Sequence, residues 1–441
     1  MWVEELRLKN IKCFEDVALT LGEGGKPYPW ITFLSENGGG KSTALQALAL
    51  LLAGIGDAQI LLPRPLTWVG SFQGVGSIMT RIHLNEGDGK LRKGDLSHAP
   101  LDAEYLTDDQ MWISMLERYS LELPSEASAE NKEVWSLIRK HFPDDKGCFA
   151  AGYGAFRRLK RSAEKSFQTP VLSTRADNFQ TQFDDDKALT TFDDWIFSLD
   201  YRISKTKDEA AIRQLKIGID AIDRLLPEGV RFEKITDEGQ VTFNVNGVVV
   251  PTLALSDGYR SVLALAGDLI FRFIRAFPDS ENPLHETGVV LIDELDIHLH
   301  PTWQREIATL FRTQFPNLQF IVATHSPLIV AGAGSDSVTY KFELEDGKAQ
   351  VSRVDNQTFK SVEKVLTGDA FELPSPFSPE AQTMLDEYDA LMEKGEKRTK
   401  KEGAKLDRLS RLIGEERPFG EHPEPGSLEA KMEAYIRKTL K

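Results

Sequence analysis

Residues 31–43 of the chain read ITFLSENGGGKST, and residues 44–52 read ALQALALLL. This is a short apolar strand, a glycine turn and then a helix rich in Ala and Leu, which is the context that a phosphate-binding loop needs. Because Gly38, Gly39 and Gly40 carry no Cβ, the backbone can come close to a phosphate. The amide groups of the turn and of the helix start then point at the same spot. The stretch therefore predicts an anion site where this helix begins.

The side chains beside the glycines suit a nucleoside triphosphate that is bound with magnesium. Lys41 would add a positive charge at the β- and γ-phosphates, and the Ser42 hydroxyl would ligate Mg²⁺. We expect the flanking Asn37 and Thr43 to bind the nucleotide as well. The pattern G-x-x-x-x-G-K-[S/T] is met except at its first position, where Ser35 replaces Gly. Serine is the smallest polar replacement, so the stretch favours a nucleotide site over an ordinary glycine-rich turn.

The composition limits the class of protein. A chain of 441 residues is long enough for two to three domains or for one large elaborated domain. Its formal net charge of −15 excludes a general nucleic-acid coat, so any DNA contact must come from a local basic patch. The longest apolar run, around residues 47–53, is too short to span a bilayer, and the acidic start of the chain does not form a secretory signal. We therefore expect a cytoplasmic protein without a membrane partner.

The rest of the chain alternates between strand and helix patterns. Short apolar or alternating runs bounded by turn residues predict strands, and longer runs without such alternation predict helices. We expect strands over residues 2–21, 77–84 and 148–154, helices over 101–141 and 191–226, and a hairpin over 241–250 with its turn at Asn246-Gly247.

A second apolar run ends in two acids. Residues 288–294 read GVVLIDE, which is typical of a buried parallel strand with carboxylates at its end. Two such carboxylates are costly to bury without a role. Beside a phosphate loop, Asp293 would hold Mg²⁺ and Glu294 would accept a proton from the attacking water. A plain pair of acids at a strand end is the alternative.

Two further segments lie where a ligand could bind, one at the start of a predicted helix and one at the end of a predicted strand. Residues 255–261 read LSDGYRS, in which Ser256 would cap a helix and Gly258 would let the backbone approach a ligand. His325 follows the apolar run 318–323 and could hydrogen-bond a γ-phosphate, because parallel sheets bind ligands at this edge. The alternation of Asp296, His298 and His300 suggests a metal site only weakly, since no further ligand run accompanies it.

A basic cluster follows the predicted strand at 148–154. It suits either contact with a DNA backbone or a solvated face of a loop, and charge runs are most often solvated. Its members are Arg157, Arg158, Lys160, Arg161 and Lys165.

In order along the chain, these motifs resemble those of the ATP-binding-cassette ATPases of the SMC, RecF and overcoming-lysogenization-defect (OLD) group. Two features depart from that group: there is no long coiled coil, and the Q-loop glutamine is not placed, since Gln168 and Gln180 fit poorly. The matching segments are the first strand (8–14), Walker A (35–42), the signature L-S-x-G-x-x-S (255–261), Walker B (289–294), the D-loop with its trailing L-H-P (295–301) and the switch histidine, His325.

The resemblance implies an α/β fold, namely an ABC-ATPase head with a mixed sheet, helical insertions and a helical C-terminal extension. It also implies ATP and Mg²⁺ as cofactors. Each ATP would lie between the Walker A motif of one subunit and Ser256 and Gly258 of the other, so two nucleotides would join a head-to-head dimer. We expect a first ATPase lobe over residues 1–100, a helical insert over 101–228 interrupted by the core strand at 148–154, a second lobe over 229–358, and a charged helical extension over 359–441.

Compact members of the group that lack coiled-coil arms are similar to the ATPase subunits of bacterial anti-phage systems such as Septu and PARIS. This likeness implies a separate effector protein, such as a nuclease, which the helical insert and the charged extension would hold. A RecF-like DNA-repair ATPase is the alternative, and it would bind DNA through the basic cluster. A transporter cassette subunit is disfavoured by the L-S-D-G form of the signature, the L-H-P trail and the large helical insertions.

Overall fold

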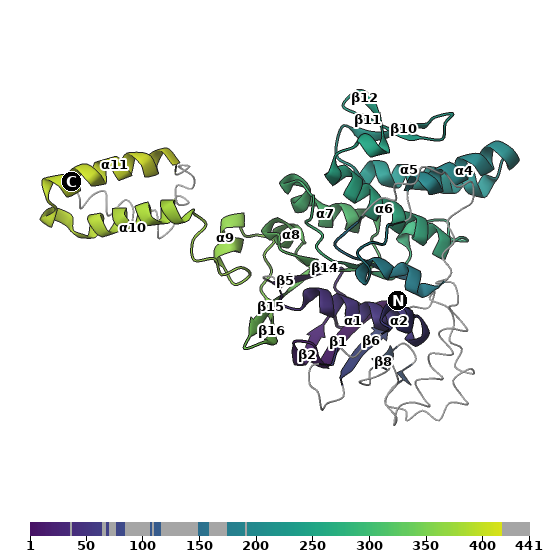
Figure 1. The fold of residues 1–441 in the computed structure, drawn as a ribbon, viewed down its shortest axis with the longest axis horizontal. Helices are drawn as coiled ribbons and strands as arrows, with labels where there is room; N and C mark the ends of the chain where they lie inside the picture. The colour runs from purple at the N-terminus through teal and green to yellow at the C-terminus, as the bar shows by residue number, and fades with distance from the viewer. Residues whose placement is uncertain are drawn as a thin grey trace. The chain divides into compact units, whose positions relative to one another are not determined.

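The computed structural model describes residues 1–35, 38–63, 68–69, 76–83, 106–107, 110–115, 149–157, 174–189 and 192–416. The chain divides into two compact units, Met1–Phe371 and Glu372–Lys441, and Figure 1 colours the described helices of the second unit yellow-green to yellow. The boundary lies later than the predicted one at residue 358. The reason is that Val365 and Ala370 pack in one apolar cluster with Leu34, Val330 and Val354 of the first unit.

The first unit is built on a mixed sheet with the strand order β16-β15-β5-β14-β13-β9. The strands β15, β5, β14, β13 and β9 run parallel, and β16 is antiparallel to β15. The carboxyl ends of the parallel strands therefore lie along one edge of the sheet. The bounds of the strands are β5 Trp30–Ser35, β9 Phe149–Tyr153, β13 Gly288–Ile292, β14 Leu318–Thr324, β15 Val338–Glu345 and β16 Lys348–Val354.

Both faces of the sheet are buried at β5, β9, β13 and β14, which explains why these four strands read as largely apolar runs. In β13, Val289 and Leu291 belong to one hydrophobic cluster, whereas Val290 and Ile292 belong to the other. The side chains of a strand alternate between its two faces. The sheet therefore separates two hydrophobic cores.

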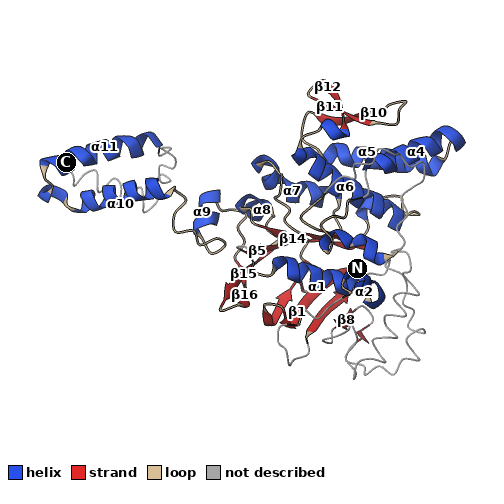
Figure 2. Ribbon diagram, viewed as in Figure 1, coloured by secondary structure: helices blue, strands red, loops and turns tan. Residues whose placement is uncertain are grey.

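The helix α1 (Lys41–Ala53) lies in the first core and is buried on nearly all sides. It contacts strands of the central sheet and also strand β6 of a second, antiparallel sheet, and Figure 2 shows α1 and α2 beside these strands. A helix that is apolar all round is expected to be enclosed in this way. The second sheet has the order β2-β1-β6-β8-β7. The bounds of these elements are α2 Ile55–Leu61, β1 Trp2–Ile11, β2 Phe14–Thr20, β6 Ser77–His83, β7 Leu106–Thr107 and β8 Gln110–Met115.

The strands β7 and β8 correct the prediction of a helix over residues 101–141. Strand β8 pairs antiparallel with β6, from Ile78 opposite Met115 to His83 opposite Gln110. Pairing with a distant strand has overridden the local helix pattern, as context often does for short apolar segments. The rest of the predicted helix lies outside the described residues.

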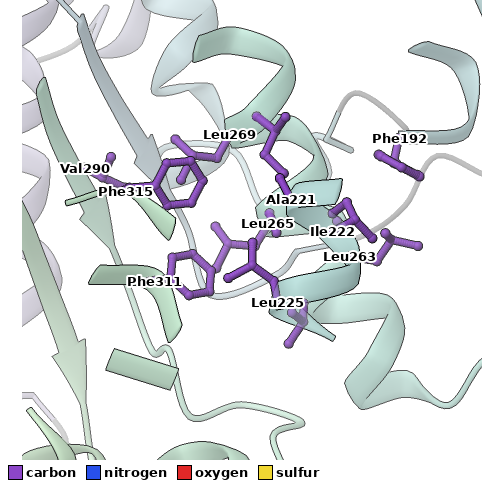
Figure 3. Close-up of a cluster of buried hydrophobic side chains, with 14 of the residues drawn as sticks. Phe192, Ala221, Ile222, Leu225, Leu263, Leu265, Leu269, Val290, Phe311 and Phe315 are labelled. Carbon is purple, nitrogen blue, oxygen red and sulfur yellow. The ribbon is translucent and has the colours of Figure 1, made fainter. Parts of the chain in front are cut away.

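The second core is formed by helices on the other face of the sheet. Figure 3 shows side chains from α5, α6 and α7 meeting Val290 of β13 in one cluster. The predicted helices and the hairpin after them are confirmed, and a third strand, β10, joins the hairpin. The bounds are α4 Phe192–Thr206, α5 Glu209–Leu225, α6 Asp257–Ala276, α7 Pro301–Gln314, β10 Val230–Ile235, β11 Val241–Val245 and β12 Val248–Pro251.

The remaining described elements are short or belong to the second unit. A hairpin precedes β5, one short helix follows β14, and another follows β16. The second unit contains two longer helices, α10 and α11. These two helices bury Leu391, Leu406 and Leu409 against each other, which agrees with the predicted helical extension. The bounds are β3 Gly22–Glu23, β4 Lys26–Pro27, α8 Pro327–Gly332, α9 Val362–Thr367, α10 Pro379–Glu393 and α11 Lys400–Glu416.

The enclosed position of α1 makes a prediction about stability. Leu48 is fully buried in the first core, so we expect Leu48→Ala to destabilise the protein by about 2–5 kcal/mol through lost burial and a residual cavity. Ile60 on α2 is exposed, and Ile60→Ala serves as the control. Thermal unfolding of both variants checks this, and equal melting temperatures would contradict the enclosed position of α1.

Candidate functional site

The site lies at the edge of the central sheet where the parallel strands end. Asp293 and Glu294 directly follow β13, His325 directly follows β14, and Lys41 begins α1 after the loop that leaves β5. The strand ends are in register, because Ile292 pairs with both Tyr153 of β9 and Val322 of β14. Ligands of open parallel sheets bind at this edge.

The phosphate loop has the backbone conformation that its glycines predict. Gly38 has a φ of 86° and Gly40 a φ of 99°, both in the left-handed region that favours glycine. A Cβ on Gly39 would lie 2.7 Å from the Ser35 hydroxyl oxygen, and one on Gly40 would lie 2.6 Å from the ring of Phe14. The loop therefore requires glycine at each position, while the predicted Asn37 lies outside the described residues.

Ser35, which departs from the loop pattern, has a defined role in the structure. Its hydroxyl oxygen accepts a hydrogen bond from Lys41 Nζ at 2.7 Å, and its carbonyl oxygen lies 3.2 Å from the same nitrogen. These contacts fix the Lys41 ammonium beneath the loop. The replacement of Gly by Ser is therefore compatible with an intact phosphate loop.

Lys41 also contacts the predicted switch histidine. The two nitrogens Lys41 Nζ and His325 Nε2 are 3.0 Å apart. An ammonium group only donates hydrogen bonds, so His325 Nε2 is the acceptor. Burial lowers the pKa of Lys41, whereas the nearby carboxylates Asp293, Glu294 and Asp296 act to raise it. A partly desolvated cation at this place is suited to bind phosphate oxygens.

The two predicted magnesium ligands touch each other. The Ser42 hydroxyl donates a hydrogen bond to the Asp293 carboxylate. Burial raises the pKa of Asp293, while the bond from Ser42 and the charges of Lys41 and Arg157 oppose that rise. A hydroxyl and a carboxylate next to a phosphate loop are oxygen donors of the kind that Mg²⁺ prefers, and Mg²⁺ takes few ligands from the protein. The residues therefore fit Mg²⁺ bound together with a nucleoside triphosphate.

The alternating Asp296, His298 and His300 do not form a metal centre. Asp296 accepts hydrogen bonds from the Thr324 hydroxyl and from the backbone N–H of His325, and His300 caps the start of α7. In the described part of the chain, no group of three or more His, Cys, Asp and Glu side chains could hold a metal ion. Asp296 instead ties the D-loop to the end of β14.

Arg157 points into the protein, so the structure supports neither of the two alternatives that the sequence left open for it, contact with DNA or a solvated face. Only 8% of it is exposed, and its guanidinium donates to the backbone carbonyls of Asp293, at 3.0 Å, and of Glu294. Arg158, Lys160 and Arg161 lie outside the described residues. The order of basic residues in the sequence gave no sign of this inward orientation.

A glutamine that the sequence analysis did not consider lies beside β9. Gln182 is buried against Gly152, and neither atom of its side-chain amide has a hydrogen-bond partner among the described residues. Its backbone carbonyl accepts a hydrogen bond from Gln46 of α1 at 2.6 Å. Of the two glutamines that were considered, Gln180 lies two residues earlier in the same turn, and Gln168 lies outside the described residues.

The signature segment lies next to the D-loop of its own chain. Ser256 is exposed and caps α6, with its hydroxyl accepting from the Tyr259 N–H at 3.4 Å. A Cβ on Gly258 would lie 2.7 Å from the carbonyl oxygen of His298. The start of α6 therefore presents its N-terminal amides at the surface, beside the segment that follows Glu294.

A phosphate loop, an acidic strand end and a histidine at one edge of a parallel sheet define a P-loop nucleotide-binding α/β protein. The chain belongs to the protein family described as "AAA domain, putative AbiEii toxin, Type IV TA system", whose model matches residues 110–331, about half of the chain. The matched part contains the signature, Walker B and His325. The α/β class with a mixed sheet is confirmed by the strand order.

Three curated relatives agree with the resemblance that the motifs indicate. The probable ATPase of retron Vc95 from Vibrio cholerae serotype O1 biovar El Tor is 32% identical over 44% of this chain and 38% of its own length. Septu protein PtuA of Bacillus mycoides (strain KBAB4) is 26% identical over 89% of this chain and 47% of its own length. The OLD nuclease of Thermus scotoductus (strain ATCC 700910 / SA-01) is 21% identical over 80% and 67%. The chain thus spans less than half the length of the first two relatives.

The position of Lys41 predicts its effect on nucleotide binding. We expect Lys41→Ala to weaken ATP binding by about 10- to 100-fold or more, because charge-assisted bonds to the phosphates are lost. Lys348, at the start of β16, carries an exposed ammonium that pairs with Glu15, and Lys348→Ala is the control. Equilibrium titration with a fluorescent ATP analogue measures both, and full retention of binding by Lys41→Ala would refute the phosphate-loop assignment.

The raised pKa of Asp293 predicts a pH dependence of metal binding. A carboxylate must be deprotonated to bind Mg²⁺. Burial raises the pKa of Asp293 above its ordinary value of 3.8, so this carboxylate is protonated at a higher pH than an exposed aspartate. We therefore expect the contribution of Mg²⁺ to ATP binding to fall with decreasing pH while the pH is still above 3.8. Titrations with and without Mg²⁺ measure this contribution, and Asp293→Asn should show little of it at any pH.

Proposed function

We propose that the chain is an ATPase that binds Mg²⁺ and ATP at this site and hydrolyses ATP between two copies of the chain. The observation that carries the proposal is the convergence of Lys41, Ser42, Asp293, Glu294 and His325 at the ends of neighbouring parallel strands. Each supplies a group that phosphoryl transfer to water requires, namely a cation, oxygen donors for magnesium, a base and a hydrogen-bonding imidazole.

Each residue of the site has its own role in binding or hydrolysing ATP. The amides of the glycine loop and the Lys41 ammonium bind the phosphates, and Ser42 with Asp293 would hold the metal. When bound, Mg²⁺ neutralises charge that develops on the phosphate oxygens. Glu294 orients the attacking water and accepts its proton. His325, which contacts Lys41 in the free site, would hydrogen-bond the γ-phosphate.

The surface position of the signature supports a shared site. Ser256 is exposed at the N-terminus of α6, a helix of 20 residues, and this end favours an anion. A second copy would bring its Ser256 and Gly258 to the γ-phosphate. Because Gly258 lies so near His298 of its own chain that a Cβ on it would be 2.7 Å from the His298 carbonyl oxygen, engagement of the signature would also affect the D-loop that follows Glu294.

We further propose that the ATPase regulates a separate effector, such as a nuclease, in anti-phage defence. The support is the likeness to Septu protein PtuA and to the probable ATPase of retron Vc95. The described helices α4 and α5 and the unit formed by α10 and α11 offer surfaces for such a partner. Within the first unit, α4 and α5 pack in the second core whereas α1, which follows the phosphate loop, packs in the first, so a partner held by α4 and α5 would leave the phosphate loop accessible.

The alternatives have less support in the structure. A RecF-like repair ATPase would contact DNA through the basic cluster, but Arg157 is buried in the nucleotide site. A transporter cassette is disfavoured by the L-S-D-G form of the signature, the L-H-P trail and the large helical insertions. Among the described residues, none of the helices combines the length and the apolar character that crossing a bilayer requires.

The proposed role of Glu294 is tested by its amide variant. We expect Glu294→Gln to bind ATP but to lose about 100-fold or more in turnover, because the base is removed while the phosphate contacts remain. The variant should then accumulate as an ATP-bound dimer. ATP turnover and light scattering after size-exclusion chromatography measure both effects.

The control for this test is Glu345→Gln, which changes an exposed carboxylate on β15. It should hydrolyse ATP like the wild type and form no trapped dimer. Turnover by Glu294→Gln at the wild-type rate would exclude Glu294 as the base, and a monomer at saturating ATP would contradict the shared site.

A further inference from the structure

Arg157 is a buried cation that the proposed chemistry does not use directly. It follows β9 by four residues and reaches across to the segment after β13. Its guanidinium donates to the carbonyl oxygens of Asp293 and Glu294, and its Nε has no hydrogen-bond partner among the described residues. It therefore contacts the backbone that carries the two functional acids, rather than their carboxylates.

The backbone at Glu294 needs such a contact. Glu294 has a φ of 45°, in the left-handed region that residues with a Cβ rarely adopt. Its N–H donates to the Asp293 carboxylate at 3.1 Å, and the next N–H, of Leu295, donates to the carbonyl of Ala323 at 3.1 Å. The Arg157 guanidinium occupies the carbonyl side of the same peptide. Surrounding contacts of this kind are what maintain an unfavourable backbone conformation at a functional residue.

The charge of Arg157 is balanced at this place. Burial lowers the pKa of Arg157 to about 10, whereas Asp293, Asp296 and Glu294 act to raise it. The group therefore remains protonated at neutral pH and can donate to both carbonyls. A buried charge is tolerated where it is paired and hydrogen-bonded.

We propose that Arg157 is a positioning residue, which holds the left-handed turn at Glu294 and so directs the Glu294 carboxylate toward the attacking water. The inference rests on the proposed function, because it concerns the same carboxylate. It differs from a general structural role in a specific way. Removing the guanidinium leaves the phosphate loop, Lys41 and the Glu294 carboxylate present, but frees the peptide that orients that carboxylate.

The kinetic test uses Arg157→Met, Arg157→Lys and a matched control. Arg157→Met should lower kcat by about 100-fold, the effect of a misplaced catalytic group, with KM changed by less than about threefold. Arg157→Lys, which can still donate to a carbonyl, should recover part of kcat. Arg213 donates to the carbonyl of Pro278 at an exposed position, and Arg213→Met should behave like the wild type.

A double variant tests whether Arg157 acts through Glu294. If it does, adding Arg157→Met to Glu294→Gln should change the residual turnover by less than about threefold, because the group to be positioned is already gone. A full additional loss would overturn the inference. A large rise in KM with an unchanged kcat would overturn it too, since Arg157 would then belong to nucleotide binding.

A measurement without nucleotide separates this inference from the proposed function. Hydrogen exchange of the peptide covering residues 288–299 should be faster in Arg157→Met than in the wild type, and intermediate in Arg157→Lys. Unchanged exchange would overturn the positioning role whether or not the protein hydrolyses ATP. Failure of the wild type to hydrolyse ATP would instead count against the proposed function alone. If Arg157→Met does not fold, the comparison of exchange and kcat rests on Arg157→Lys against the wild type.

Discussion

The site depends on the parallel, in-register pairing of β9, β13, β14 and β5. This pairing brings to one edge segments from distant parts of the sequence, since β9 pairs with β13 and β5 pairs with β14. Backbone hydrogen bonds continue the pairing past the strands, since Asp293 N–H donates to Tyr153 and Leu295 N–H donates to Ala323. The backbone positions of the two acids are therefore set by the sheet itself.

The second constraint is the balance of buried charge at that edge. Lys41 and Arg157 lie among Asp293, Glu294 and Asp296, and burial acts against the charged form of Lys41, Arg157 and Asp293 alike. Each charge is tolerated because the others and the surrounding hydrogen bonds compensate it. The arrival of a triphosphate with its metal would change this balance.

The parts of the fold that could be predicted from the sequence are those with local signals. The turn at Gly38 to Gly40 lies between a strand and a helix, and the acids at Asp293 and Glu294 follow a continuous apolar run, so both patterns appear within a few residues. His325 follows another such run. The helices α4 to α7 and the hairpin of β11 and β12 have periodic or turn signals of the same kind.

The parts that were missed depend on distant partners. Strand β8 forms by antiparallel pairing with the edge of β6. No pattern within residues 110–115 specifies that pairing. Arg157 stands in a run of basic residues that favours a solvated face, yet its partners are two backbone carbonyls 136 and 137 residues away. Gln182 was missed because what distinguishes it from the other glutamines is its burial against Gly152. That contact is visible only in the folded chain.

The central claim is that one nucleotide site is completed by two copies of the chain. It is tested most directly by an experimental structure of Glu294→Gln prepared with ATP and Mg²⁺. We expect a two-fold dimer in which each ATP contacts Lys41 and the glycine loop of one copy and Ser256 of the other, with the metal between Ser42, Asp293 and the phosphates. ATP bound away from the loop, or bound to a single copy with Ser256 remaining in solvent, would contradict the account.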